Sequence, residues 1–319
     1  MLAAAAAGGF YHWAQSPLSQ QANPLDFRIL PGSSLKSVAR QLNAAGLEVW
    51  PDGLGLLGRL LRVDAGIKAG SYSLTPGLTP YTLLQKLVRG DVTQAEITLL
   101  EGQTFRQWRE RLDAHPELEH LSRGLSETEL LARLGIAETA AEGLFFPDTY
   151  LFDKHSSDLA LLARAYRMMS SRLQGEWAQR ADGLPYRTPY QALIMASIVE
   201  KETGREADRG LVAAVFVNRL KLGMLLQTDP TVIYGLGSQF DGNIRKRDLQ
   251  TDTPYNTYTR AGLPPTPIAM PGQAALQAAL HPAASDVLYF VARGDGSSQF
   301  SRSLEEHNRA VNRYQRGRP

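Results

Sequence analysis

The sequence predicts an α+β protein built from a small mixed subdomain and a larger, mainly helical domain. Two patterns lead to this fold class. Within the first hundred residues, short strand patterns alternate with short amphipathic helices, whereas helical periodicity dominates the remainder. The chain has 319 residues, of which 43% are hydrophobic and 21% charged, so it can bury the cores of two domains of ordinary size. The expected regions are 1–24, 25–100 and 101–319.

The region 25–100 is expected to fold in the order β-α-α-β-α-β. These elements are expected at 27–30, 35–45, 54–63, 70–74, 80–89 and 97–100. Ser34 and Thr79 stand where a side-chain oxygen can cap the start of a helix. Gly46 and Gly90 stand where the same two helices should end.

The region 101–319 is expected to be a larger and mainly helical α+β domain. Its expected helices cover 108–112, 130–134, 157–180, 190–203, 208–222 and 303–314, and an expected strand covers 287–292. Ser126 and Glu129 form a capping box before the second helix, and Gly204 separates the fourth helix from the fifth. Between 223 and 271 the chain is rich in proline and is expected to be a long loop.

The N-terminal run from Met1 to Trp13 carries no charge and includes the aromatic residues Phe10 and Tyr11. A membrane span needs about 20 apolar residues and a signal peptide needs a basic start, and this run has neither. Aromatic side chains of this kind are typical of the headgroup level of a membrane. We interpret the run as the outer end of a single-pass anchor, followed by a polar linker over 16–24. A disordered, alanine-rich leader is the alternative.

Composition argues against several classes of protein. The chain has no cysteine, which excludes disulfides, thiolate metal sites and a cysteine nucleophile. None of its six histidines stands three or four residues from another, so no helix offers the histidine pair of a zinc hydrolase. We therefore expect no metal and no cofactor. The net charge is only +2, which argues against a nucleic-acid partner.

The expected helix over 190–203 is apolar almost all round, yet it carries Glu200 and Glu202 at its C-terminal end. A helix turns by about 100° per residue, so the two carboxyl groups should point about 200° apart. The side chains one and two turns behind Glu202 form the more apolar stripe, with Val199, Ile198 and Met195. Desolvation and the negative end of the helix dipole should both raise the pKa of Glu202. A raised pKa suits a general acid.

Two features leave the role of Glu202 open. An ion pair with Lys201 or Arg219 is the alternative to catalysis. Glycosidases usually use two carboxylates, and Asp229 is a candidate for the second. One carboxylate suffices where the substrate supplies its own nucleophile, as the 6-hydroxyl of an N-acetylmuramyl unit can.

Three loops carry residues of the kind that line a sugar groove. The stretch 255–258 offers two tyrosine rings and an amide, the stretch 262–265 is a rigid proline turn, and the stretch 145–150 has a similar character. Each is also compatible with an ordinary packed loop.

Several longer stretches resemble the endolytic murein transglycosylase (YceG-like) family. They keep order and spacing across about 180 residues, at 142–150 (EGLFFPDTY), 195–203 (MASIVEKET), 215–237, 255–272, 281–283, 288–292 and 307–308. A second and looser resemblance lies in 31–39 (PGSSLKSVA), which looks like the opening of a LysM repeat, a small glycan-binding unit. A plain structural subdomain is the alternative there.

The resemblance implies a lyase that cuts the β-1,4 bond between N-acetylmuramic acid and N-acetylglucosamine within nascent glycan strands. The products would carry 1,6-anhydro ends, and the cut would terminate glycan elongation. The resemblance places the catalytic carboxyl at Glu202. The substrate groove carried over from the family comprises Gln227, Thr228, Asp229, Tyr255, Asn256 and Tyr258.

The resemblance also implies partners and a location. The partners are peptidoglycan glycan strands and a cell-wall synthase, and the location is the inner membrane, with a single-pass anchor and the domain 101–319 in the periplasm. Region 1–24 would then be a partial anchor and linker, and 25–100 a LysM-like subdomain. Two other functions stay open, a muramidase-type hydrolase that uses Asp229 and a non-catalytic peptidoglycan-binding scaffold.

Overall fold

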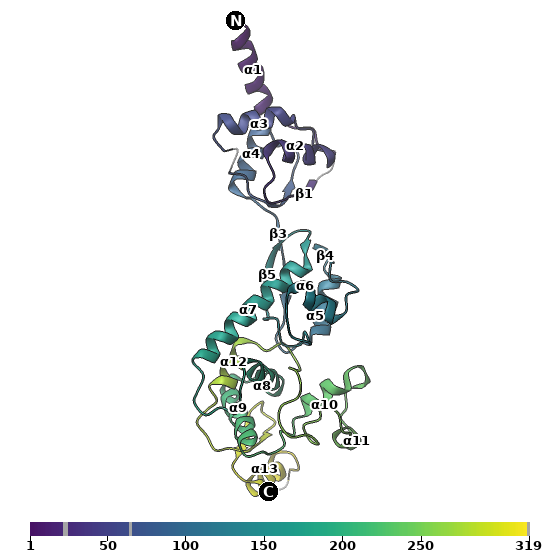
Figure 1. Ribbon diagram of the computed structural model, residues 1–319, viewed down its shortest axis with the longest axis vertical. Helices are drawn as coiled ribbons and strands as arrows, with labels where there is room; N and C mark the ends of the chain where they lie inside the picture. The colour runs from purple at the N-terminus through teal and green to yellow at the C-terminus, as the bar shows by residue number, and fades with distance from the viewer. Residues whose placement is uncertain (22–24, 64–65, 318–319) are drawn as a thin grey trace. The chain divides into compact units, whose positions relative to one another are not determined.

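The computed structural model describes residues 1–21, 25–63 and 66–317, and it is a mixture of helices and short strands (Figure 1). The predicted α+β class is confirmed. The chain forms two compact units. The first comprises 1–97, 115–119 and 150–157, and the second comprises 98–114, 120–149 and 158–319. The predicted domain boundaries stay a prediction.

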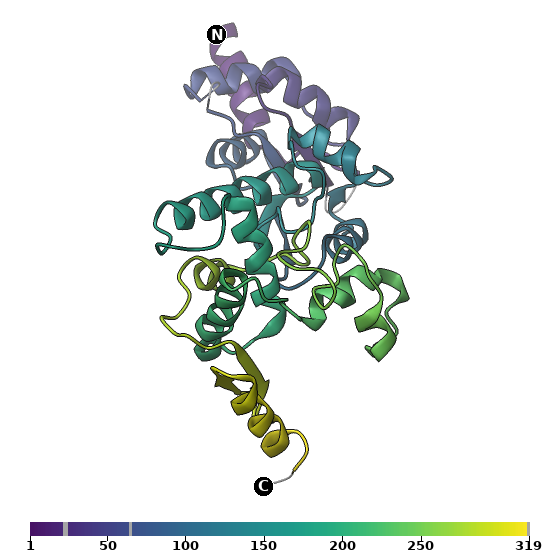
Figure 2. The same ribbon diagram turned by 60° about the horizontal axis from the view of Figure 1, so that its bottom comes forward.

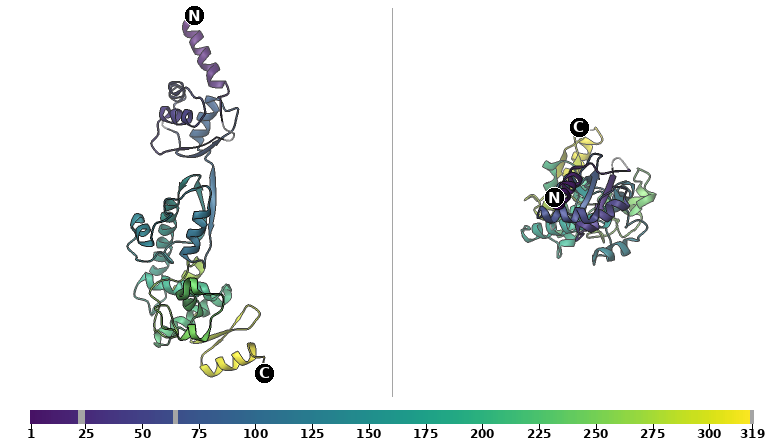
Figure 3. Two further views of the ribbon diagram at one scale, coloured as in Figure 1. Left: turned by 90° about the vertical axis from the view of Figure 1, so that its right-hand side faces the viewer. Right: turned by 90° about the horizontal axis from the view of Figure 1, so that it is seen from above.

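The first unit contains the expected order of elements. These are β1 (Leu25–Ile29), α2 (Leu35–Ala44), α3 (Pro51–Leu60), β2 (Gly70–Leu74), α4 (Pro80–Arg89) and most of β3 (Gln94–Leu99). Strands β1 and β2 pair antiparallel, from Leu25 opposite Leu74 to Ile29 opposite Gly70. Alternate residues of β1 are buried, and α2 and α3 lie side by side (Figure 3). One apolar core therefore joins β1 and β2 to the helices α2, α3 and α4.

The caps expected from the sequence are present. The Ser34 hydroxyl accepts a hydrogen bond from the Ser37 amide, and Thr79 forms a capping box with Thr82. Gly90 ends α4 with a φ of 74°, a left-handed conformation that glycine adopts without strain. Local sequence signals thus define both ends of α4.

The predicted single-pass membrane anchor is wrong for this structure. The N-terminal helix α1 (Leu2–Gln15) has 14 residues. At about 1.5 Å per residue this length falls well short of a hydrocarbon core of about 30 Å. Among the described residues, no helix is both long and apolar enough to cross a membrane. The rings of Phe10 and Trp13 pack against each other and against Trp50, whereas Tyr11 is exposed. The last residues of the expected linker, 22–24, lie outside the described residues.

Three further short strands lie between residues 118 and 157. Strand β3 pairs with β5 (Asp148–Asp153), and β4 (Leu118–Glu119) pairs in parallel with β6 (Ser156–Ser157).

The second unit is mainly helical. Its helices are α5 (Phe105–Ala114), α6 (Glu127–Leu134), α7 (Asp158–Ala178), α8 (Pro189–Glu202), α9 (Glu206–Lys221), α10 (Asp229–Leu236), the 3-10 turn η1 (Gly237–Gln239), α11 (Lys246–Gln250), α12 (Gln273–Leu280) and α13 (Leu304–Tyr314). Helix α8 packs against α7, α9, α10 and α12, so it runs through the core. Strands β7 (Tyr289–Ala292) and β8 (Ser298–Ser301) form an antiparallel hairpin, and α13 lies along it (Figure 2).

Candidate active site

Helix α8 is buried and apolar along most of its length and has two glutamates, Glu200 and Glu202, at its C-terminal end. All residues from Ala192 to Val199 are buried. Thr188 caps the N-terminus by accepting a hydrogen bond from the Gln191 amide. The core thus fixes the axis of the helix, and with it the directions in which its last side chains point.

Glu200 and Glu202 point to different surroundings, as the helical spacing predicts. A carboxylate oxygen of Glu200 accepts a hydrogen bond of 2.9 Å from the backbone amide of Gly272. Burial raises the pKa of Glu200, and the Gly272 amide opposes this rise. Gly272 begins the approach to α12, so Glu200 ties a neighbouring loop to α8 and does not share the pocket described next.

Glu202 lines a pocket of about 590 Å³. Helices α8, α9, α10 and α13, the hairpin strand β7 and the loops around 226 and 258 supply the walls. Besides Glu202, the lining residues are Phe216, Arg219, Leu226, Gln227, Asp229, Tyr258, Tyr289, Phe290, Val291, Ala292, Leu304, His307, Val311 and Gln315. A pocket of this size with a few converging polar groups is typical of a small-molecule or oligosaccharide site.

The carboxyl of Glu202 is held by one neighbour and desolvated by the rest. The Thr228 hydroxyl donates a hydrogen bond to Oε1 of Glu202. Burial raises the pKa of Glu202 to about 6, although the Thr228 hydrogen bond lowers it, and the charge of Asp229 contributes to the rise. Neither Lys201 nor Arg219 forms an ion pair with Glu202 in the part of the chain that the structure describes. A carboxyl with this pKa is still partly protonated near neutral pH, as a general acid needs to be.

The other groove residues expected from the family fall into two groups. Gln227, Asp229 and Tyr258 line the pocket, and the Tyr258 hydroxyl donates a hydrogen bond of 2.6 Å to Oδ1 of Asp229. Thr228 is buried and reaches the pocket through its bond to Glu202. Gln227 has a φ of 52°, which is unusual for a residue with a side chain.

Asn256 and Tyr255 do not line this pocket. Asn256 is 1% exposed, and its Nδ2 donates to the carbonyls of three residues at the C-terminal end of α11, Asp248, Leu249 and Thr251. The Tyr255 hydroxyl shares a hydrogen bond of 2.8 Å with Thr266. These contacts hold together the loop that carries Tyr258, and direct substrate contact by Asn256 or Tyr255 stays a prediction.

Several pocket residues were not among the predicted groove residues, and three of them bear on ligand recognition. Arg219 comes from α9, Tyr289 from β7 and His307 from α13. The sequence contained one signal for all three, because 215–237, 288–292 and 307–308 lie within the stretches that carry the family resemblance. Only folding brings the three segments together, so their spacing along the chain gave no hint of a shared wall.

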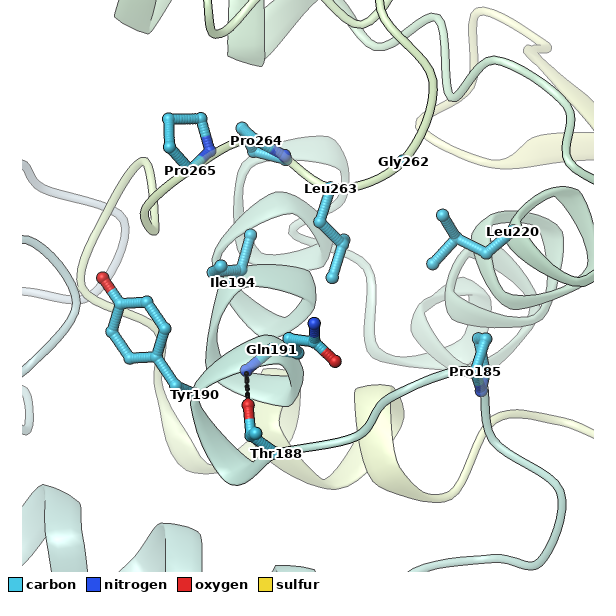
Figure 4. A pocket seen from close by; sticks show the side chains of 10 residues that line it. All are labelled: Pro185, Thr188, Tyr190, Gln191, Ile194, Leu220, Gly262, Leu263, Pro264 and Pro265. Carbon is cyan, nitrogen blue, oxygen red and sulfur yellow. Dashed lines mark hydrogen bonds between the residues drawn. The ribbon is translucent and has the colours of Figure 1, made fainter.

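A second pocket of similar size lies near the other end of α8. It measures about 530 Å³ and is lined by Pro185, Thr188, Tyr190, Gln191, Ile194, Leu220, Gly262, Leu263, Pro264 and Pro265 (Figure 4). The proline turn that the sequence suggested as a groove wall lies here, with none of its residues lining the Glu202 pocket.

One group of side chains has the composition of a metal site. Ligand atoms of Asp113, His120 and Asp158 lie within 4.8 Å of one another. However, Asp158 already accepts hydrogen bonds from the amide and the hydroxyl of Ser122, and Arg123 lies 3.6 Å from Asp113. These contacts give Asp113 and Asp158 an ordinary structural role, and none of the three residues is among those that line the Glu202 pocket.

A mainly helical domain with one desolvated carboxyl in an aromatic and polar pocket has the features of an enzyme that uses a general acid. Residues 27–313 match the model of the YceG-like family. This match covers most of the chain, so the chain belongs to the YceG-like family. The family predicted from the sequence is therefore confirmed.

Curated relatives and a solved structure agree with this family. The endolytic murein transglycosylase of Bacillus subtilis (strain 168) is 34% identical over 268 residues, which are 78% of this chain and 74% of the relative. The endolytic murein transglycosylase of Streptococcus pneumoniae (strain D39) is 29% identical over 279 residues, and the match covers 77% of this chain but only 50% of that relative. A crystal structure of a YceG-like protein from Listeria monocytogenes superposes with a TM-score of 0.58 at 29% identity, covering 90% of this chain and 98% of that one.

Proposed function

We propose that this chain is a lytic transglycosylase that cuts peptidoglycan glycan strands internally, with Glu202 as its catalytic carboxyl. The observation that carries the proposal is the state of Glu202, a carboxyl whose pKa burial raises to about 6 in a pocket with room for sugar rings. Named relatives with this activity support the substrate class.

The proposed reaction needs one carboxyl group. Protonated Glu202 gives its proton to the bridging oxygen as the bond from C1 of N-acetylmuramic acid to that oxygen breaks. The 6-hydroxyl oxygen of the same muramyl unit then bonds to C1, and its proton passes to the Glu202 carboxylate. The products are a new non-reducing N-acetylglucosamine end and a 1,6-anhydro end, and the carboxyl is protonated again. Cuts of this kind inside nascent strands would end their elongation.

The neighbours of Glu202 suit this cycle. The Thr228 hydroxyl donates to Oε1, which orients the carboxyl and stabilises its anionic form after proton transfer. Asp229 accepts a hydrogen bond from Tyr258, so one of its oxygens is already engaged. This contact argues against the competing hydrolase, in which Asp229 would have to activate a water molecule.

Product analysis with matched variants tests the proposal. Wild-type protein should release fragments with 1,6-anhydro ends from purified strands, as detected by mass spectrometry. Glu202→Gln should fold normally and release them at least about 100-fold more slowly, because an amide cannot donate the required proton. Glu200→Gln is the matched control, since its amide oxygen can still accept from Gly272. Reducing ends instead of anhydro ends would support the hydrolase, and equal losses in both variants would defeat the assignment of Glu202.

We also propose that the first unit holds a LysM-like, glycan-binding subdomain. The antiparallel strands β1 and β2 stand before and after the helices α2 and α3 in the sequence. This is the order expected for such a unit. A cell-wall synthase is the protein partner that fits action on nascent strands. Binding of the chain to insoluble peptidoglycan after Glu202→Gln, and co-purification of a synthase, would test these two statements separately.

A further inference from the structure

Arg219 is a buried cation in the wall of the Glu202 pocket. It lies on α9 and is only 7% exposed, yet it is among the residues that line the cavity. Burial lowers the pKa of its guanidinium, and Arg219 is not among the groups that shift the pKa of Glu202. The same pocket thus holds two separate ionisable features, an acid and a cation.

The hydrogen bonds of Arg219 all go to neutral acceptors. Its Nε donates to the Leu288 carbonyl at 2.7 Å, and its Nη1 donates to the Leu226 carbonyl at 3.0 Å and to Oε1 of Gln227 at 3.3 Å. Across the described ranges of the chain, Nη2 forms no hydrogen bond and the guanidinium has no carboxylate partner. A buried charge without a counter-ion is costly, so it is expected where a ligand supplies the opposite charge.

The guanidinium of Arg219 lies over one aromatic ring, which in turn stacks on a second. The guanidinium carbon of Arg219 lies 5.0 Å from the centre of the Tyr289 ring. The His307 ring stacks on the same tyrosine, with centroids 5.3 Å apart. Nδ1 of His307 is buried and has no hydrogen-bond partner among the described residues. Burial and the nearby Arg219 both lower the pKa of His307, so a neutral ring is expected beside the cation. A neutral imidazole can donate one further hydrogen bond to an anion.

We propose that Arg219 is the receptor for a carboxylate of the muramyl unit, and that it thereby selects which sugar occupies the cleavage position. This inference rests on the function proposed above. N-acetylmuramic acid differs from N-acetylglucosamine by its lactyl ether, which ends in a carboxyl group. A peptide-free strand presents that carboxylate directly, and a substituted strand presents carboxylates on its stem peptide. Because the two sugars alternate, recognition of one carboxylate sets the register of the whole strand, so that Glu202 meets one of the two kinds of glycosidic bond.

Chemically altered strands test the inference on the wild-type protein, without any change in its fold. The probes are peptide-free strands with free lactyl carboxylates, the same strands with these groups converted to neutral methylamides, and peptide-bearing strands with free or amidated peptide carboxylates. Loss of a charge-assisted hydrogen bond should raise KM about 10- to 100-fold. An increase confined to the lactyl pair assigns the lactyl carboxylate, and one confined to the peptide pair assigns the stem peptide. Equal KM values within both pairs would overturn the inference.

Variants of Arg219 separate recognition from structural support. Arg219→Gln should abolish the difference between charged and neutral strands, whereas Arg219→Lys should retain part of it because the charge remains. Loss of structure alone would weaken binding of all strands alike and leave their ratio unchanged. Arg205→Gln, an exposed arginine that does not line the pocket, is the control.

Binding measurements distinguish failure of this inference from failure of the proposed function. Titration of Glu202→Gln with the charged and the neutral strands measures recognition without cleavage. Carboxylate-dependent binding without wild-type cleavage would defeat the proposed function and support the receptor. Wild-type cleavage without carboxylate dependence would do the reverse, and absence of both would defeat the two together.

Discussion

The two pockets beside α8 have similar volumes, about 590 Å³ and 530 Å³, but opposite chemical characters. The first contains Glu202, Asp229, Arg219 and His307, whereas the second is lined only by uncharged side chains. A cavity can accept sugars by shape, but bond cleavage needs a group that can give and take a proton. The ionisable side chains, and not the volume of the cavity, therefore indicate where the chemistry takes place.

The carboxyl of Glu142 shows that a raised pKa by itself does not locate the catalytic site either. Burial raises the pKa of Glu142 to about 8, yet Glu142 lines neither pocket. Both of its oxygens accept from the Phe105 amide, and its carboxyl also bonds with Tyr234. These contacts join the start of α5 to α10, so Glu142 has a structural position. Among the carboxyl groups of the described residues whose pKa is raised, only Glu202 lines either of the two pockets.

The largest expected effect is the loss of turnover in Glu202→Gln. Removal of a general acid should lower kcat by about 10²- to 10⁴-fold, while KM changes little because the shape of the side chain is kept. Steady-state release of soluble fragments measures both constants. A loss of less than tenfold would remove the distinction between the two pockets.

The pH dependence should be the next largest effect. Glu202 must be protonated to act, and its pKa is about 6, so activity should be high below that value and fall about tenfold per pH unit above it. Thr228→Val removes the hydrogen bond that lowers this pKa, so the falling limb should move to higher pH. Rates measured across pH 4 to 9, roughly the range in which carboxyl and histidine groups titrate, check the shift. An unchanged limb would mean that another group controls the profile.

The same pKa predicts that stability, like activity, is higher at low pH. Because the folded-state pKa of Glu202 is raised from 4.5 to about 6, the folded protein loses stability as pH rises through that interval. The loss is at most about 2 kcal/mol, from about 1.4 kcal/mol per pKa unit. Glu202→Gln should therefore be more stable than wild type above pH 6 and similar to it near pH 4. Denaturant titrations at the two pH values test this, and a destabilised variant at high pH would contradict it.

Local signals in the sequence predicted the helices well, and they predicted α8 best. Thr79 caps α4 and Ser126 forms a capping box with Glu129, both as expected, because a cap depends only on neighbours in the chain. Helix α10 was missed because its proline was interpreted as part of a loop. In fact Pro230 stands in the first turn, two residues after the cap position of Thr228, where the missing amide hydrogen of a proline costs no helical hydrogen bond.

The candidate site was predictable only in part. The direction of Glu202 follows from helical spacing, and its apolar surroundings follow from the stripe behind it. The role of Asn256 does not, because an amide that binds sugar and an amide that binds three backbone carbonyls look identical in a sequence. Arg219 was considered only as an ion-pair partner of Glu202, and its actual acceptors lie on segments that only the tertiary structure brings near.

A moderate effect on kcat/KM is expected when the hydrogen bond from Tyr258 to Asp229 is removed. Tyr258→Phe removes the hydroxyl that donates to Oδ1 of Asp229, a hydrogen bond to a charged group, so kcat/KM should fall about tenfold. The 1,6-anhydro ends of the remaining product should be unchanged. Appearance of reducing ends in this variant would show that a freed Asp229 can activate water. This result would support the alternative function, a hydrolase that uses Asp229.

The smallest expected effect belongs to the second pocket. Gln191→Ala removes an amide group from its wall, and Leu263→Ala shortens a side chain in its proline turn. Neither position lines the Glu202 pocket. Gln191 also accepts from the Arg187 amide, so this variant should lose some stability, which a melting curve will register. Both variants should nevertheless cleave short strands within about twofold of the wild-type kcat/KM, since neither side chain lies near the reacting bond. If KM rises for long strands but not for short ones, the second pocket holds a distant part of the same glycan. The contrast between the two pockets would then be one between a place of chemistry and a place of binding along a single groove.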